Sequence, residues 1–276
     1  MKLPILPIVR EAYGYVWAER RLFWALAIPA VIVLALVSAV SGVFGQAALT
    51  SGLKTGALMW ALAYATLQFG AVVMYSVAWH RAYLLPSDPM TPRAAYRWGQ
   101  RQVRFLFAYF KLLGVTIPFG IVVGILFSTF FAAPHGPSAG GAPSHIGGGA
   151  TWFAWSMAIV GIWIYARLSM MFPAAALDAP STIAMSWRMT KGNGFALFWI
   201  IVLVAVPITG ISFLITEAII GLYRATTVGN TLTVNLLISL ITIFMTFIGL
   251  AVGVSAVSIS YKRLIDAGVT GEAPRA

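Results

Sequence analysis

The sequence predicts an all-α membrane fold, a polytopic bundle of six transmembrane helices, and three observations support this prediction. Hydrophobic residues make up 60% of the chain and charged residues only 9%, against roughly 45–50% and about 25% in an ordinary soluble domain. The apolar runs are long and show no polar face, whereas helices and strands of soluble proteins alternate apolar and polar positions. The charged residues collect between these runs. Lipid is therefore expected to surround most of the chain.

Six apolar runs reach the length of about 20 helical residues that the hydrocarbon core requires. The spans are expected at residues 22–44, 57–80, 105–132, 151–172, 195–220 and 232–261. The first run is longer than the apolar part of a secretory signal, so we expect a retained anchor. We expect residues 1–276 to form one six-span membrane domain without a soluble domain.

The basic residues predict the orientation of these spans. Of the 18 Lys and Arg residues, all but Lys54 and Arg224 fall on one side of the predicted spans. Because Lys and Arg are enriched in cytoplasmic loops, both termini and the segments 81–104 and 173–194 are predicted to be cytoplasmic. The net charge of +11 is then a property of the membrane-facing loops. Anionic membrane lipid is the expected partner, and nucleic acid is not expected.

A unit of one cytoplasmic segment, one outward span and one return span is predicted to occur three times, as three helix hairpins. Its cytoplasmic segments each carry a Trp before basic residues, and they lie at 11–24, 93–107 and 182–198. In the second and third units, Pro118 and Pro207 follow this Trp at the same spacing, but the first unit breaks the pattern.

Short interfacial helices are expected where the second and third units begin, over 91–103 and 180–193. Thr91-Pro92 and Pro180-Ser181 supply helix starts, and Gly192-Asn193-Gly194 permits the following corner. The alternative is that these segments are ordinary basic loops in which the aromatic residues have no special role.

The third unit carries a motif. Ala176-Leu177-Asp178, followed by IAMSWRMTKGN at 183–193, resembles the characteristic loop of a family of six-helix bacterial inner-membrane proteins. That family includes the membrane domain of some glycerophosphodiester phosphodiesterases. The resemblance covers the topology of the whole chain, but its motif is confined to 176–193. It implies a bacterial inner-membrane location, and it does not imply phosphodiesterase activity, which in the fused relatives belongs to a separate soluble barrel.

Catalytic and metal-binding patterns are scarce. Cysteine is absent, and six of the seven carboxylates lie in predicted cytoplasmic loops or tails. Glu217 is the exception, near the outer end of the fifth span, where an interfacial carboxylate is the favoured interpretation. His135 and His145 stand in a Gly-rich loop without further ligands, which falls short of a metal site. Lys111, inside the third span, is expected to reach the interface with its head group. No cofactor, metal or enzymatic activity is predicted.

Two functions remain open. The first is a non-enzymatic membrane protein whose basic cytoplasmic face binds anionic lipid or an unknown protein partner. Its candidate contact residues are Arg97, Trp98, Arg101, Arg104, Trp187, Arg188 and Lys191, which otherwise serve only as topology determinants. The alternative is a small transporter or lipid-moving protein, as internal repeats and proline-containing spans suggest. A polar cavity at mid-membrane depth between the third and fifth spans would favour transport, and a filled bundle would favour the basic-face function.

Overall fold

The computed structural model describes residues 2–50, 54–87, 91–131, 148–226 and 231–269. The described ranges contain helices and turns and no strand. The helices are α1 (Ile5–Ala18), α2 (Arg20–Thr50), α3 (Lys54–Leu84), α4 (Pro92–Ala95), α5 (Gln100–Phe131), α6 (Gly148–Leu168), α7 (Met171–Ala176), α8 (Ile183–Met189), α9 (Gly194–Thr226) and α10 (Thr231–Asp266).

Six of these helices, α2, α3, α5, α6, α9 and α10, are long and apolar enough to cross a membrane. This confirms the predicted all-α fold with six spans, and the chain is an integral membrane protein. Five of the six contain 31 to 36 residues. At 1.5 Å per residue they are roughly 45–55 Å long, which exceeds the hydrocarbon core of about 30 Å. Helices of this length tilt or extend beyond the lipid.

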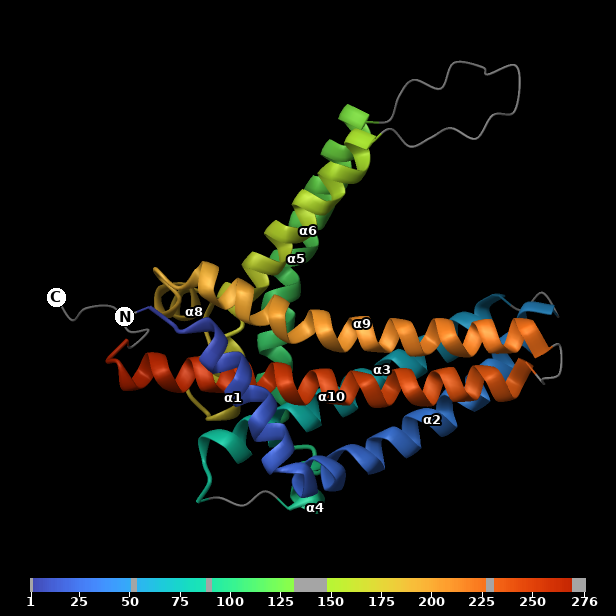
Figure 1. Ribbon diagram of the computed structural model, residues 1–276, viewed down its shortest axis with the longest axis horizontal. Coiled ribbons are helices and arrows are strands. Elements are labelled where there is room, and N and C mark those ends of the chain that lie inside the picture. The colour runs from blue at the N-terminus through green and yellow to red at the C-terminus, as the bar shows by residue number, and fades with distance from the viewer. Residues whose placement is uncertain (1, 51–53, 88–90, 132–147, 227–230, 270–276) are drawn as a thin grey trace.

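The spanning helices form two groups that diverge like the arms of a V (Figure 1). Helices α2, α3, α9 and α10 run together as a four-helix group, whereas α5 and α6 pair into a hairpin that points away from it. The groups meet at the end of the molecule that carries α1, α4, α7, α8 and the last turns of α3 and α10. We call this end the basic end. The predicted six-helix bundle is therefore split, and its apex lies at the basic end.

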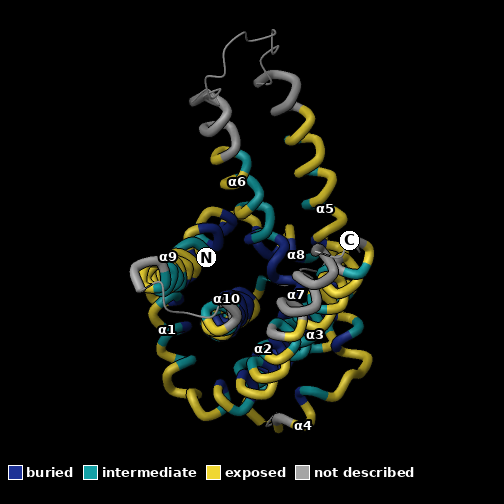
Figure 2. The backbone as a smooth tube through the Cα atoms, turned by 90° about the vertical axis from the view of Figure 1, so that its right-hand side faces the viewer, coloured by how far each residue is buried: buried dark blue, intermediate teal, exposed yellow. Residues whose placement is uncertain are grey.

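Apolar packing closes the apex of the V. Val77 of α3, Phe105 and Leu112 of α5, and Met171 and Phe172 of α7 belong to one buried cluster. The buried backbone segments accordingly gather where the hairpin meets the other helices, and the outer part of the hairpin is largely exposed (Figure 2). The hairpin is thus fixed at one end only.

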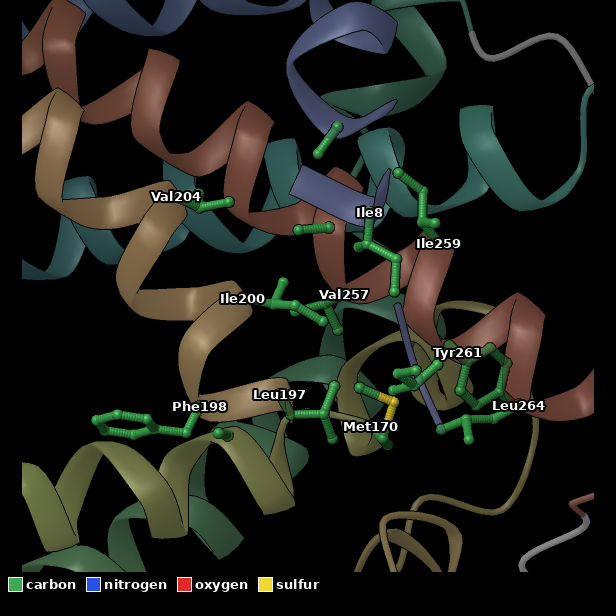
Figure 3. Packing of buried hydrophobic residues seen from close by; sticks show 14 of the residues in the cluster. Ile8, Met170, Leu197, Phe198, Ile200, Val204, Val257, Ile259, Tyr261 and Leu264 are labelled. Carbon is green, nitrogen blue, oxygen red and sulfur yellow. The ribbon is translucent and has the colours of Figure 1, made fainter. Parts of the chain in front are cut away.

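A second core joins α1 to the four-helix group. Ile8 of α1 packs with Met170 from the α6–α7 junction, Leu197 and Val204 of α9, and Val257 of α10 (Figure 3). Polar contacts reinforce this docking, because Glu11 of α1 accepts hydrogen bonds from Tyr83 (2.8 Å) and Arg263 (2.5 Å). Burial raises the pKa of Tyr13, and its phenol donates to the Val204 carbonyl at 3.0 Å.

The predicted interfacial helices are shorter than expected. Over 91–103 the structure has only the single turn α4, and α5 already begins at Gln100. The start is as predicted, since the Thr91 hydroxyl accepts from the Ala94 amide at 3.3 Å. Over 180–193 the helix is α8, capped by Thr182, one residue after the predicted start.

The corner after α8 follows the prediction, because Gly192 has a φ of 80°. That value lies in the left-handed region that glycine adopts without strain. Short helices of 14, 4 and 7 residues precede α2, α5 and α9. The threefold repeat stays a prediction.

Candidate functional site

A cavity lies at the apex of the V, where the α5–α6 hairpin leaves the four-helix group. Its volume is about 730 Å³, within the range of about 300–1,000 Å³ that is typical of ligand pockets. Residues of α3, α5, α6, α7, α9 and α10 line it. The cavity therefore lies between the third and fifth spans, where a polar cavity at mid-membrane depth was expected to favour transport and a filled bundle to favour the basic-face function.

The wall of this cavity is mainly aliphatic and aromatic, with uncharged hydrogen-bonding side chains set into it. These polar residues are Ser76, His80, Tyr109, Tyr165, Thr209, Ser212, Thr216, Thr242 and Thr246. No Asp, Glu, Lys or Arg lines the cavity in the described part of the chain. The cavity is thus less polar than the one expected of a transporter, and its wall suits a mostly apolar molecule with a few uncharged polar atoms.

One side of the cavity is open. Thr209 and Phe213 of α9 and Thr242 and Thr246 of α10 line the cavity and are nevertheless exposed. The reason is the divergence of the α5–α6 hairpin from α9 and α10 (Figure 1), so that none of the described helices covers this face. Because exposed faces of spanning helices meet acyl chains in a bilayer, the opening is lateral, toward lipid.

Hydroxyl groups line the open part of the cavity. Thr209, Ser212 and Thr216 follow one another at spacings of three and four residues, which places them on one face of α9. Across the cleft, the Thr246 hydroxyl donates to the Thr242 carbonyl of its own helix at 2.7 Å. Bonds of this type satisfy a hydroxyl in an apolar setting without a partner from another helix.

The closed part of the cavity contains Ser76 and His80, one turn apart on α3 and each only 1% exposed. Nδ1 of His80 lies 2.7 Å from the Ser258 hydroxyl of α10. The preceding residue, Trp79, donates from its indole nitrogen to the Ser255 hydroxyl at 2.8 Å. Two neighbouring side chains of α3 are thus held by two serines of α10, which fixes the floor of the cavity.

Ser76 differs from the other buried serines, because its hydroxyl has no hydrogen-bond partner. The remaining buried serines in the described ranges are all bonded, and these are Ser169, Ser186, Ser255, Ser258 and Ser260. A buried hydroxyl without a partner costs about 1–3 kcal/mol. The cavity floor therefore carries an unused polar group.

Arg101 and Arg104, two of the predicted lipid or partner contacts, have an internal partner. Asp178 accepts from Nε of Arg101 at 2.9 Å and from Nη1 of Arg104 at 3.1 Å. Lys111, further along α5, donates to the Ser181 carbonyl at 2.8 Å. The Lys111 head group, which was expected to reach the interface, extends to the loop between α7 and α8, and together with Arg101 and Arg104 it attaches α5 to that segment.

Trp187 takes part in a second internal arrangement. The guanidinium of Arg167 lies 3.8 Å from the ring centre of Trp187 and 5.4 Å from that of Trp163. It donates to the Trp187 carbonyl (2.8 Å) and the Thr190 hydroxyl (3.2 Å). Arg167 thus links the end of α6 to α8, and Trp187 supports this link although 40% of its surface is exposed.

The other predicted contacts, Arg97, Trp98, Arg188 and Lys191, are exposed at the basic end. No hydrogen bond or ion pair joins the group at 97–104 to the group at 187–191 in the described part of the chain. Glu217 is exposed on α9. His135 and His145 lie outside the described residues.

The sequence interpretation missed the cavity floor. His80 served only to mark the end of the second span, and Ser76 was not singled out. The available signal was a Ser and a His four residues apart in an otherwise apolar run, because such a spacing puts both on one helix face. Which helix faces this pair depends on tertiary packing.

Comparison with family models, curated proteins and solved structures gives no match for this chain. The case for a function therefore depends on the geometry of the cavity and on the charges around it.

Proposed function

We propose that this membrane protein binds a lipid-like molecule in the cavity at the apex of the V and moves it, without an enzymatic step. The cavity of about 730 Å³ between the third and fifth spans is the observation that carries the proposal. It is the reason to prefer the transporter or lipid-moving alternative over a scaffold with a filled core. The lateral opening supplies an entry path from the bilayer.

The attachment of the hairpin suggests how movement takes place. Arg101, Arg104 and Lys111 hold the basic-end half of α5, whereas the opposite half diverges from α9 and α10 (Figure 1). In this proposal the apex stays fixed and the far end of the hairpin approaches or leaves α9. Closure covers the bound molecule, and opening releases it into lipid.

A second function is supported by the exposed cations of the basic end. Arg97, Arg188 and Lys191 form no ion pair within the described ranges, and the exposed Trp98 adjoins Arg97 in the chain. Each Lys or Arg near an anionic surface contributes about 1 kcal/mol of attraction. We propose that this face lies against anionic lipid of a bacterial inner membrane, with both termini in the cytoplasm, and offers a site for a protein partner. The resemblance to the phosphodiesterase membrane domain is compatible with this placement.

A substitution that fills the cavity tests the primary proposal. A Cβ added at Gly253 meets nothing within 4 Å, so Gly253→Leu places a side chain in the cavity without a backbone clash. Gly120→Leu is the matched control, because Gly120 is equally open but lies on α5 outside the cavity lining. Both variants are reconstituted in nanodiscs and in liposomes.

Native mass spectrometry then measures retained lipid, and a fluorescent-lipid assay in the liposomes measures movement between leaflets. Wild type and Gly120→Leu are expected to retain lipid and to accelerate its movement, and Gly253→Leu is expected to lose both properties. A wild-type protein that retains no lipid, or a Gly253→Leu variant that behaves as wild type, would refute the proposal.

A further inference from the structure

The hydroxyl of Ser76 is buried in the wall of the cavity and has no hydrogen-bond partner. Each of the five other buried serines named above has a bond, and Ser255 and Ser260 use carbonyls one turn earlier in their own helix. Ser76 makes no such bond with Val72, although the same option exists in α3. A buried polar group that faces a cavity and lacks a protein partner indicates an external partner, a ligand or a water molecule.

His80 adds a hydrogen-bond donor at the same place. Within the described chain the Ser258 hydroxyl makes no bond to a carbonyl of its own helix, unlike Ser255 and Ser260, so its proton is available to Nδ1 of His80. A neutral imidazole that accepts at Nδ1 carries its proton on Nε2. Nε2 has no partner among the residues that the structure describes. With His80 in this tautomer, the floor of the cavity offers a serine hydroxyl and an imidazole N–H one helical turn apart.

Charge restricts what these donors can bind. The described lining contains no Lys or Arg to neutralise a phosphate and no Asp or Glu to neutralise an amine. A buried charge without a counter-charge is strongly unfavourable. The nearby cations of α5 are instead at the basic end, where Arg101, Arg104 and Lys111 already have protein partners.

We infer that the cavity takes an uncharged amphiphile whose carbonyl or hydroxyl oxygen lies between Ser76 and His80 and whose apolar body extends along α9 and α10 to the lateral opening. Two kinds of lipid share this chemistry, diacylglycerols and long-chain quinones. The inference rests on the proposed function and narrows it from lipid-like molecules to uncharged ones.

The experiment offers the protein a choice of lipids. Wild-type protein is incorporated in nanodiscs of phosphatidylcholine and phosphatidylglycerol that contain a small fraction of dioleoylglycerol or, separately, of a quinone with a decyl chain. Native mass spectrometry identifies the adduct that survives removal of the bulk lipid. Retention of dioleoylglycerol or of the quinone is expected. Comparison of the two nanodisc preparations shows which of the two head groups the protein prefers. Retention of phospholipid alone would overturn the inference.

Ser76→Ala tests the position of the head group. Loss of one hydrogen bond is expected to weaken retention of the uncharged lipid about three- to tenfold, while thermal stability without the lipid is unchanged or higher. Ser260→Ala is the control, because Ser260 is also buried but bonds to its own helix and does not line the cavity. Equal retention by wild type and Ser76→Ala would mean that a water molecule, and not the lipid, is the hydrogen-bond partner of the Ser76 hydroxyl. That result would overturn the inference.

Gly253→Leu separates this inference from the proposed function. Phospholipid that wild type retains and Gly253→Leu loses would support the proposed function and overturn only the choice of an uncharged ligand. If wild type retains no lipid of any kind, both fail together.

Discussion

Asp178 accepts a hydrogen bond from Nε of Arg101 at 2.9 Å, and this ion pair joins the turn after α7 to the first turn of α5. Asp178 has a φ of 61°, in the left-handed region that Asp and Asn tolerate better than most residues. Arg104 approaches the second carboxylate oxygen. One carboxylate therefore holds two of the cations that the sequence assigned to lipid or partner binding.

Asp178→Asn is expected to release Arg101 and Arg104 while leaving the backbone conformation accessible. Since both pairs are partly exposed, the loss of stability is small, about 0–1 kcal/mol. Two freed cations are expected to strengthen retention of phosphatidylglycerol by severalfold. Native mass spectrometry of protein released from nanodiscs of phosphatidylcholine and phosphatidylglycerol measures the retained lipid. Asp266→Asn, another exposed carboxylate at the basic end, is the control, and an equal gain in that variant would contradict this prediction.

Close packing of Gly194 against Arg167 gives a second prediction. A Cβ at Gly194 would lie 3.1 Å from Cδ of Arg167 and 3.3 Å from the Trp163 indole nitrogen. Gly194→Ala is therefore expected to displace Arg167 and to destabilise the protein by about 1–3 kcal/mol, measured as a lower Tm in detergent. Gly253→Ala is the control, since its added Cβ meets nothing within 4 Å. Equal Tm values for the two variants would show that Arg167 is not held as described.

Hydropathy and charge were sufficient to predict the six spans, because both signals depend on the local sequence and on the bilayer. The lengths of five spanning helices were underestimated, whereas α6 ends at Leu168, four residues before the predicted end of the fourth span. Apolar composition marks the part of a helix that lipid can cover, whereas backbone hydrogen bonding continues until a turn interrupts it, as in α10, which ends at Asp266 instead of Tyr261.

The divergence of the hairpin and the cavity were not predicted, since they depend on contacts between distant segments. The Trp79–Ser255 and His80–Ser258 bonds join residues 176 and 178 positions apart, and no local pattern specifies such pairs. The same reason explains why the basic residues at 101 and 104 looked available. Their carboxylate partner lies 77 and 74 positions further along the chain.

Docking of α1 depends on Glu11, which gives a third prediction. Glu11→Gln removes the charge that Arg263 and Tyr83 contact but keeps the size of the side chain. Because hydrogen bonds to charged groups contribute more than neutral ones, and because Glu11 is partly exposed, we expect a loss of about 1 kcal/mol in thermal unfolding. Glu19→Gln, in which the exposed carboxylate of the next residue after α1 is changed, is expected to have little effect. A larger loss in Glu19→Gln would mean that Glu11 does not anchor α1.

The predicted orientation gives the last prediction, and the absence of cysteine makes it simple to test. Single-cysteine variants Lys191→Cys and Lys54→Cys place one thiol at the basic end and one between the first two spans. In intact cells, a membrane-impermeant maleimide is expected to label Lys54→Cys and to leave Lys191→Cys unlabelled until the membrane is opened. The physical reason is the excess of Lys and Arg at the basic end, which retains that side in the cytoplasm. The reverse labelling pattern would mean that the basic end lies outside the cell. The closed floor of the cavity would then face the outside of the cell instead of the cytoplasm.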